Sequence, residues 1–174
     1  MGTTPALSTE ASSVRAPHAI SRSIHVPDSR VSRPVKIRNG VVLERSGGAL
    51  RRMLPPFRAG VGGPVAGGHQ YVPWVALDDV VGVFVAALTE EAYTGPVNAS
   101  APEPVTNREF SRALGRVLHR PALVPVPAFA LNLLFGEMSS VLTASQRMVP
   151  RRALRLGYGF RYAKLDEALR AVLD

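Results

Sequence analysis

The chain has 174 residues, 46% of them hydrophobic, which is enough for one domain of ordinary size, or part of a larger one, with a packed core. The formal net charge is +8, and almost all basic residues are arginine because Lys36 and Lys164 are the only lysines. Such a charge permits association with nucleic acid or anionic surfaces but does not indicate a fold. Cysteine is absent, which excludes disulfides, thiolate catalysis and cysteine-based zinc sites. No apolar run reaches the roughly 18 residues of a transmembrane helix, so no membrane span is expected.

Residues 1–34 are expected to form a disordered leader. Residues 1–33 are rich in serine, alanine, arginine and proline, and no helical or strand period persists among them. The alternative is an organelle transit peptide, because arginine and serine are plentiful and acidic residues are few. The first interpretation goes with a cytoplasmic location and the second with an organellar one.

The order of strand, helix, loop and strand after the leader is typical of an α/β protein. Residues 35–43 predict a buried parallel strand because valine and isoleucine dominate it. Gly40 inside it indicates a bulge or a close backbone approach, with a simple kink as the alternative. Residues 47–58 predict a basic helix that ends or kinks just before Pro55. The glycine-rich residues 60–68 predict a loop, either a flexible connector or a substrate lid.

The next segment pairs a strand with a strongly apolar helix. Residues 71–77 predict the strand, and residues 79–90 predict a helix that is apolar nearly all round and therefore buried on most sides. Asp78 is expected to be the N-cap of this helix and Asp79 to lie in its first turn. Residues 96–100 predict another short strand.

A capping box from Thr106 to Glu109 predicts a helix that continues to about His119. Arginine recurs every four residues along it, which is usual for a solvated face. The alternative function for the chain is a non-catalytic basic module that uses this ladder to bind an anionic partner. Nucleic acid is not expected as that partner, because no aromatic interleaving or recognised motif accompanies the arginines. The ladder consists of Arg108, Arg112, Arg116 and Arg120.

The remainder is expected to be mostly helical. The expected elements are an extended segment at 121–127, a short apolar helix at 128–135, a helix from Ser139, a helix at 151–156 that stops at Gly157, and an amphipathic helix at 164–173.

A search for catalytic patterns finds no complete constellation. There is no Gly-x-Ser-x-Gly elbow, no P-loop, and no glycine-rich turn that joins a strand to a helix. None of the histidines is spaced with other ligand types as a metal site requires, and His69 reads as a polar residue at a strand start. The sequence therefore names no catalytic residue and no metal ligand.

Several separated motifs occur in a characteristic order: RNGVVLERSGGALRRMLPPFRAGVGGP, GPVNASAPEPVTNREF, VPVPAFAL and GEM. In this order they resemble the C-terminal half of an epimerase-like member of the extended or atypical short-chain dehydrogenase/reductase superfamily, the NAD-dependent epimerase/dehydratase group, with its C-terminal domain of unknown function. The resemblance covers roughly residues 35–174.

The resemblance implies an α/β fold: residues 35–119 as the C-terminal part of a doubly wound Rossmann-like sheet, and residues 120–174 as a small, mostly helical module. It also implies NAD or NADP as cofactor and a nucleotide-sugar-like substrate. A missing N-terminal half or a second copy of the chain would be the partner.

By the same resemblance, the strand end at Asn39, Gly40, Val41 and Val42 lies beside the nicotinamide, and Gln70 and Trp74 lie on the substrate side. Trp74 is equally well interpreted as a core residue. The family's acid/base pair is Tyr-x-x-x-Lys, and no tyrosine here has a lysine four residues later. We therefore expect a truncated homologue that keeps the substrate-side half and is inactive alone. The tyrosines are Tyr71, Tyr93, Tyr158 and Tyr162.

Overall fold

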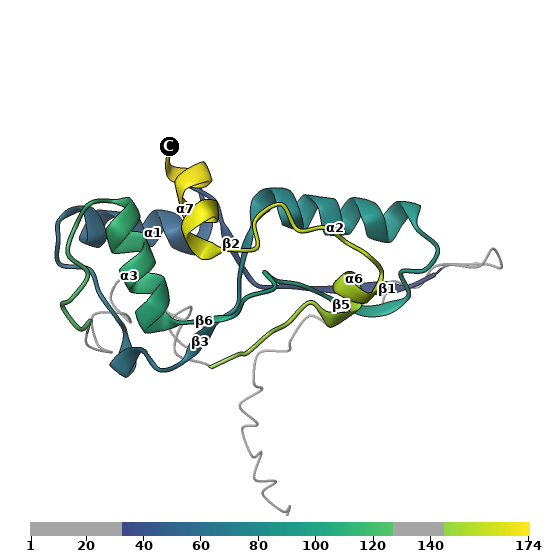
Figure 1. Ribbon diagram of the computed structural model, residues 1–174, viewed down its shortest axis with the longest axis horizontal. Coiled ribbons are helices and arrows are strands. Elements are labelled where there is room, and N and C mark those ends of the chain that lie inside the picture. The colour runs from purple at the N-terminus through teal and green to yellow at the C-terminus, as the bar shows by residue number, and fades with distance from the viewer. Residues whose placement is uncertain (1–32, 127–144) are drawn as a thin grey trace, which may run out of the picture. The chain divides into compact units, whose positions relative to one another are not determined.

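The computed structural model describes residues 33–126 and 145–174 (Figure 1). Contacts along the chain separate Met1–Ser32 from a compact unit, Arg33–Asp174. The helices expected at 128–135 and from Ser139, and nearly all of the expected leader, lie outside the described residues. The compact unit mixes helices with parallel strands, so the expected α/β class is confirmed.

The described strands form three pairs. Two of the pairs are parallel, as in an α/β fold, and the third is antiparallel. Their members are β1 (Val35–Asn39) with β5 (Gly95–Ala99), β2 (Val41–Leu43) with β4 (Trp74–Ala76), and β3 (Tyr71–Val72) with β6 (Val105–Thr106).

The described helices follow the expected order. α3 carries the predicted capping box, in which the Thr106 side chain accepts from the Glu109 N–H and the Glu109 carboxylate accepts from the Thr106 N–H. The helix at the expected 151–156 ends, as predicted, before Gly157, which has a positive φ of 82°. The helices are α1 (Gly48–Arg58), the 3₁₀ turn η1 (Ala66–Gly68), α2 (Leu77–Thr89), α3 (Asn107–Val117), α6 (Arg151–Arg155) and α7 (Leu165–Leu173).

The expected break of α1 before its prolines is wrong, because the helix continues to Arg58 with Pro55 and Pro56 inside it. A proline lacks the N–H but keeps its carbonyl, and here the Pro55 and Pro56 carbonyls accept from the N–H groups of Ala59 and Val61. Burial of Leu54 and Phe57 before and after the prolines stabilises the last turn. Packing thus outweighs the local preference for termination.

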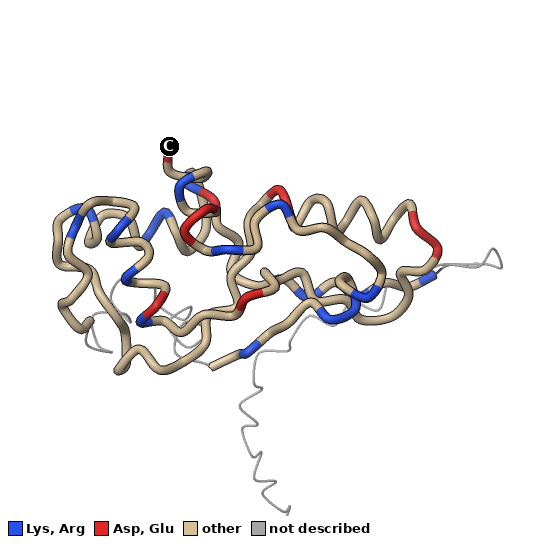
Figure 2. Tube along the Cα trace, in the orientation of Figure 1, with Lys and Arg blue, Asp and Glu red and all other residues tan. Residues whose placement is uncertain are grey.

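The expectation that α2 is buried on most sides is also wrong for the described residues. One face, with Val80, Val83 and Ala87, is buried over β1 and β5, whereas five apolar residues on another face are 40% or more exposed. Figure 2 shows acidic residues only at the two ends of α2 and no charge between them. The five exposed residues are Leu77, Val81, Phe84, Val85 and Leu88.

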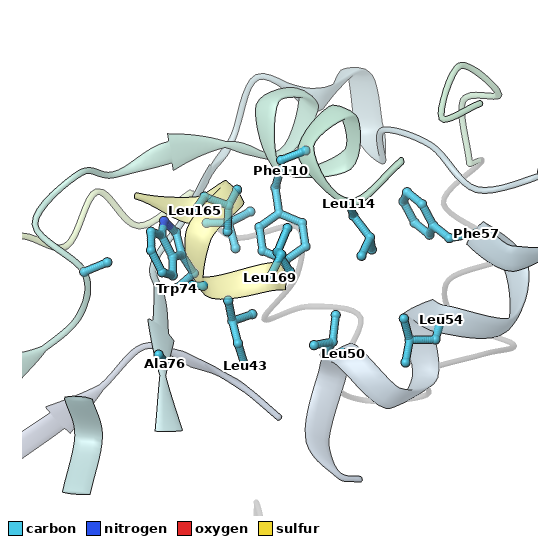
Figure 3. Close-up of a cluster of buried hydrophobic side chains, with 14 of the residues drawn as sticks. Leu43, Leu50, Leu54, Phe57, Trp74, Ala76, Phe110, Leu114, Leu165 and Leu169 are labelled. Atoms are coloured by element: carbon cyan, nitrogen blue, oxygen red, sulfur yellow. The ribbon is translucent and has the colours of Figure 1, made fainter. Parts of the chain in front are cut away.

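The larger hydrophobic core joins β2, near the start of the described chain, to the C-terminal helix α7. α1, α3 and α7 pack together around β2 and β4. Figure 3 shows Phe110 and Leu114 of α3 in the middle of this cluster, with Trp74 and Leu165 on one side and Leu54 and Phe57 of α1 on the other. Residues from α7 (Leu165, Ala168 and Leu169) are as deeply buried as those from α1 and α3. A smaller cluster fills the space between α2, α6 and the β1–β5 pair. In the part of the chain that the structure describes, no helix is long and apolar enough to cross a membrane.

Candidate functional site

The strand expected at 35–43 divides at Gly40, where the chain changes partner from β5 to β4. The Gly40 N–H donates to the Ala99 carbonyl at 2.9 Å, and the Val41 N–H donates to the Pro73 carbonyl. A Cβ at position 40 would collide with the Pro73 carbonyl oxygen. The close backbone approach predicted for this glycine is therefore confirmed, and its partner is Pro73.

The four residues expected beside the cofactor lie where β1 passes into β2: Asn39 ends β1, Gly40 follows it, and Val41 and Val42 begin β2. Asn39 is exposed, while Gly40, Val41 and Val42 are half-buried. Asn39 and Gly40 are adjacent to Ala99 at the carboxyl end of β5, the edge at which open α/β sheets bind ligands, whereas Val41 and Val42 pair with β4. This edge is the candidate site of the described chain.

Gln70 is buried, with 8% of its surface exposed, and its Nε2 donates to the Val65 carbonyl at 3.0 Å. The Val65 N–H donates to Oδ1 of Asn107 at 2.7 Å, so two side chains hold both backbone groups of one loop residue. Asn107 is a residue that the sequence reasoning did not select, since its only local signal was a place inside the capping box. Together with the Arg108 bond to the Gly67 carbonyl, these contacts anchor the loop of residues 60–68.

Trp74 lies in the core, with 1% of its surface exposed, and its Nε1 donates to the Glu103 carbonyl at 3.2 Å. The sequence left two interpretations of Trp74 open, a substrate contact and a core residue, and the structure places the side chain in the core. The indole holds β4 against Glu103, in the segment before β6. Trp74 directly follows Pro73, the residue whose carbonyl lies against Gly40. Trp74 is also the strand partner of Val41, one of the candidate-site residues, and Val41 packs against the hydrophobic cluster that contains Trp74.

The expected capping by Asp78 is wrong, because α2 begins at Leu77 and its N-cap is Ala76. Asp78 instead forms an exposed ion pair with Arg161 at 2.9 Å. Asp79 lies in the first turn as predicted and is 2% exposed. Its two carboxylate oxygens accept the backbone N–H groups of Arg161, at 2.7 Å, and Tyr162, at 3.1 Å. Burial raises the pKa of Asp79, and the two N–H donors oppose that rise.

Asp79 therefore joins the start of α2 to the chain between α6 and α7. The Tyr158 hydroxyl adds a hydrogen bond to the Asp79 carbonyl at 3.1 Å, and burial raises the pKa of this phenol. A phenol with a raised pKa and no lysine beside it is poorly suited to donate or accept protons at neutral pH. Asp79 and Tyr158 together form a structural clamp between the start of α2 and residues 158–162.

The arginine ladder is partly engaged by the protein itself. Arg108 donates to the Gly67 carbonyl, and Arg116 makes a bidentate pair with Asp166 of α7 at 2.8 and 2.9 Å. Arg112 and Arg120 line an open hollow of about 420 Å³ at the end of α3. His69 is exposed, and the described residues hold no cluster of acidic or histidine side chains that could bind a metal.

Comparison with known proteins shows which family this chain belongs to. Residues 126–172 match a domain of unknown function (DUF1731). The chain is 43% identical over 143 residues to the epimerase family protein SDR39U1 of Mus musculus. The aligned region covers 82% of this chain and 49% of the mouse protein. A crystal structure of human epimerase family protein SDR39U1 (isoform 2) with NADPH has a TM-score of 0.77 and 38% identity, over 83% of this chain and 50% of that chain.

In sequence and fold, the chain corresponds to the C-terminal half of an epimerase-like short-chain dehydrogenase/reductase. The resemblance that the motifs indicated is thereby confirmed. A nucleoside-diphosphate sugar epimerase from Corynebacterium glutamicum is similar as well, with 29% identity and a TM-score of 0.59 over 81% of this chain and 26% of that chain. The chain spans about half the length of the curated relatives that it matches. These comparisons lend no support to the basic binding module, and we do not propose it.

Proposed function

We propose that this chain supplies the substrate-side half of an NAD(P)-dependent, epimerase-like oxidoreductase that acts on a nucleoside-diphosphate sugar. The observation that carries the proposal is the 38% identity and TM-score of 0.77 with one half of a protein whose crystal structure contains NADPH. The substrate class is suggested by the Corynebacterium glutamicum relative, which is described as a nucleoside-diphosphate sugar epimerase.

The end of β1 fits the nicotinamide end of such a cofactor. Asn39 offers an exposed amide that can hydrogen-bond a carboxamide, and Val41 and Val42 offer half-buried apolar surface for a planar ring. When bound there, the cofactor would supply or accept a hydride. No residue of this sequence matches the glycine-rich turn that would cradle the pyrophosphate, so the fit is limited to the nicotinamide end.

Gln70 and Trp74 are proposed to act on the substrate side as positioning residues. Both side chains are buried and hydrogen-bonded to backbone carbonyls, so neither is free to bind a sugar hydroxyl in the described arrangement. Gln70 would set the position of the loop 60–68, and Trp74 that of the segment around Glu103. Their substitution should change substrate affinity through those segments.

The chain alone is proposed to be inactive, because none of its tyrosines has the lysine that would lower its pKa for proton transfer. The test incubates the purified full chain with UDP-glucose and NAD or NADPH, with and without the separately produced N-terminal half of the mouse relative. We expect turnover only in the mixture. Turnover by the chain alone would refute the proposal.

The cofactor position is tested in the same mixture. Asn39→Ala removes the exposed amide and should weaken NADPH binding about tenfold, the effect of losing one well-placed hydrogen bond or slightly more. Lys36→Ala is the matched control, since Lys36 is exposed on the same strand but lies before its carboxyl end. Equal affinities for the two variants would remove Asn39 from the cofactor site.

A cytoplasmic location is proposed for the protein, with import into an organelle as the rival. Fluorescent fusions of the full chain and of the chain without residues 1–33 would be compared in cells of the encoding organism. Both should be diffuse in the cytoplasm. Organellar signal that disappears on deletion would establish residues 1–33 as a transit peptide.

A further inference from the structure

Residues 145–149 run along the edge of the sheet that holds the candidate site. Near one end of this segment, the Gln146 N–H donates to the Tyr71 carbonyl of β3 at 3.4 Å. Near the other end, the Met148 carbonyl accepts from the hydroxyl of Ser100, the residue that directly follows β5, at 3.3 Å. Figure 1 shows the segment passing from beside β3 toward β5 and α6.

Both anchor points of this segment adjoin the backbone contacts of Gly40. Tyr71 precedes Pro73 by two residues, and the Pro73 carbonyl lies against Gly40. Ser100 directly follows Ala99, whose carbonyl accepts from the Gly40 N–H at 2.9 Å. The segment therefore lies beside the carboxyl ends of β1 and β5, the edge at which open α/β sheets bind ligands.

Arg147 lies in the middle of this segment and is held by an aromatic ring. Its Cζ is 5.5 Å from the centroid of the Tyr71 ring, within the range of a cation–π interaction. Arg147 is exposed and Tyr71 is half-buried, so the ring supports the guanidinium from the protein side. A cation–π contact uses the face of the guanidinium and leaves its N–H donors available for a planar anionic group.

Arg161 shows how the same geometry looks when the protein itself neutralises the charge. Its Cζ is also 5.5 Å from a tyrosine ring, that of Tyr162, but its Nη1 lies 2.9 Å from a carboxylate oxygen of Asp78. Among the described residues, no acidic side chain forms an ion pair with Arg147 and no group accepts a hydrogen bond from it. Within that part of the chain, Arg147 thus brings an uncompensated charge to the ligand edge.

We propose that Arg147, positioned by Tyr71, is a specificity-determining residue that binds the diphosphate of a nucleoside-diphosphate sugar. This rests on the proposed function and assigns the phosphate contact of its substrate. The planar fork of a guanidinium matches two phosphoryl oxygens with parallel hydrogen bonds, and the nearby Tyr71 hydroxyl offers a further donor. The cofactor also carries phosphates, but its nicotinamide end is the part proposed to lie at this edge.

The test measures the affinity of the full chain for UDP by isothermal titration calorimetry at low salt. Arg147→Gln removes the charge and the fork and should weaken UDP binding about tenfold or more. Arg161→Gln is the matched control, because it removes the same kind of cation–π contact away from the candidate edge and keeps the backbone N–H that Asp79 accepts. Arg147→Lys keeps the charge without the fork and should fall between. All variants should keep the fluorescence of the buried Trp74.

Each outcome decides the proposal. A loss of UDP affinity confined to the Arg147 variants supports it, together with much weaker binding of uridine, which lacks the diphosphate. Absence of UDP binding by the full chain overturns it, as do equal affinities of Arg147→Gln and Arg161→Gln or equal affinities for UDP and uridine. If Arg147→Gln weakens the binding of NADPH and not of UDP, the contact belongs to a cofactor phosphate and the substrate assignment is refuted.

The site and the proposed function can fail separately. In the mixture with the N-terminal half of the mouse relative, Arg147→Gln should raise the KM for UDP-glucose and leave kcat unchanged, as expected for a contact equally strong in the ground state and the transition state. UDP binding that depends on Arg147, without turnover in the mixture, would keep the site and refute the proposed function. Turnover with a KM that Arg147→Gln leaves unchanged would keep the function and overturn the site.

Discussion

The carboxylate of Asp79 is the clearest target for a stability test, because the neighbouring Asp78 is a natural control. Asp79 is 2% exposed and accepts two backbone N–H groups from residues 161 and 162, whereas the Asp78 side chain is 56% exposed and forms one surface ion pair. Both lie in the first turn of α2. Replacing each by alanine therefore removes a similar interaction with the helix dipole and a very different set of contacts.

The expected magnitudes follow from those contacts. Hydrogen bonds to a charged acceptor contribute roughly 1.5–3 kcal/mol each, and the low end applies to Asp79 because the donors are partly exposed and the charge itself is costly to bury. We expect Asp79→Ala to lower the free energy of unfolding by about 2–3 kcal/mol. Asp78→Ala should lower it by no more than about 1 kcal/mol, the usual limit for an exposed ion pair. Asp79→Asn keeps one acceptor oxygen and should fall between.

Urea denaturation of the full chain at neutral pH measures these values directly. Trp74 is the only tryptophan and is 1% exposed, so its fluorescence reports loss of the core. Equal midpoints for Asp79→Ala and Asp78→Ala would refute the clamp. They would mean that α2 and the chain before α7 are held together by other contacts.

Two further predictions concern backbone packing and pH. Gly40→Ala should destabilise the chain by about 1–3 kcal/mol, because its methyl group meets the Pro73 carbonyl, whereas Gly159→Ala, with open space around it, should change the unfolding midpoint little in the same urea experiment. The backbone hydrogen bond from Thr106 lowers the pKa of Glu109 below its usual 4.5. The ionised Glu109 therefore stabilises the fold above pH 4.5, and this stabilisation is lost as the pH falls from 4.5 through the lowered pKa. The difference in unfolding temperature between wild type and Glu109→Gln should therefore shrink on acidification below about pH 4.5, and a constant difference would contradict the capping role.

Local sequence signals predicted the features that depend on near neighbours. The capping box at Thr106, the stop at Gly157 and the amphipathic α7 were all predicted correctly, since each follows from residues a few positions apart. The features that escaped prediction join distant segments. Asn107 holds Val65 across 42 positions and Asp79 holds Arg161 across 82, and no local pattern distinguishes these polar residues from caps or surface groups.

The candidate site was predictable only in part, for the same reason. Gly40 signalled a close approach, but its partner Pro73 lies between β3 and β4, which the sequence predicted as one continuous strand. α2 was predicted as apolar all round, which is correct for its composition. The exposure of one of its faces depends on which other segments are present, and composition carries no information about that.

The burial of α7 changes how deletions in this protein should be interpreted. All but the last residue of α7 lies within the region that matches the domain of unknown function, and the helix fills the same core as α1 and α3, with Leu169 fully buried. A stop codon before Leu165 would strip that core of one wall and leave Arg116 without its Asp166 partner. Loss of activity in such a deletion would report misfolding and degradation, and it would give no information on whether the region carries a function of its own.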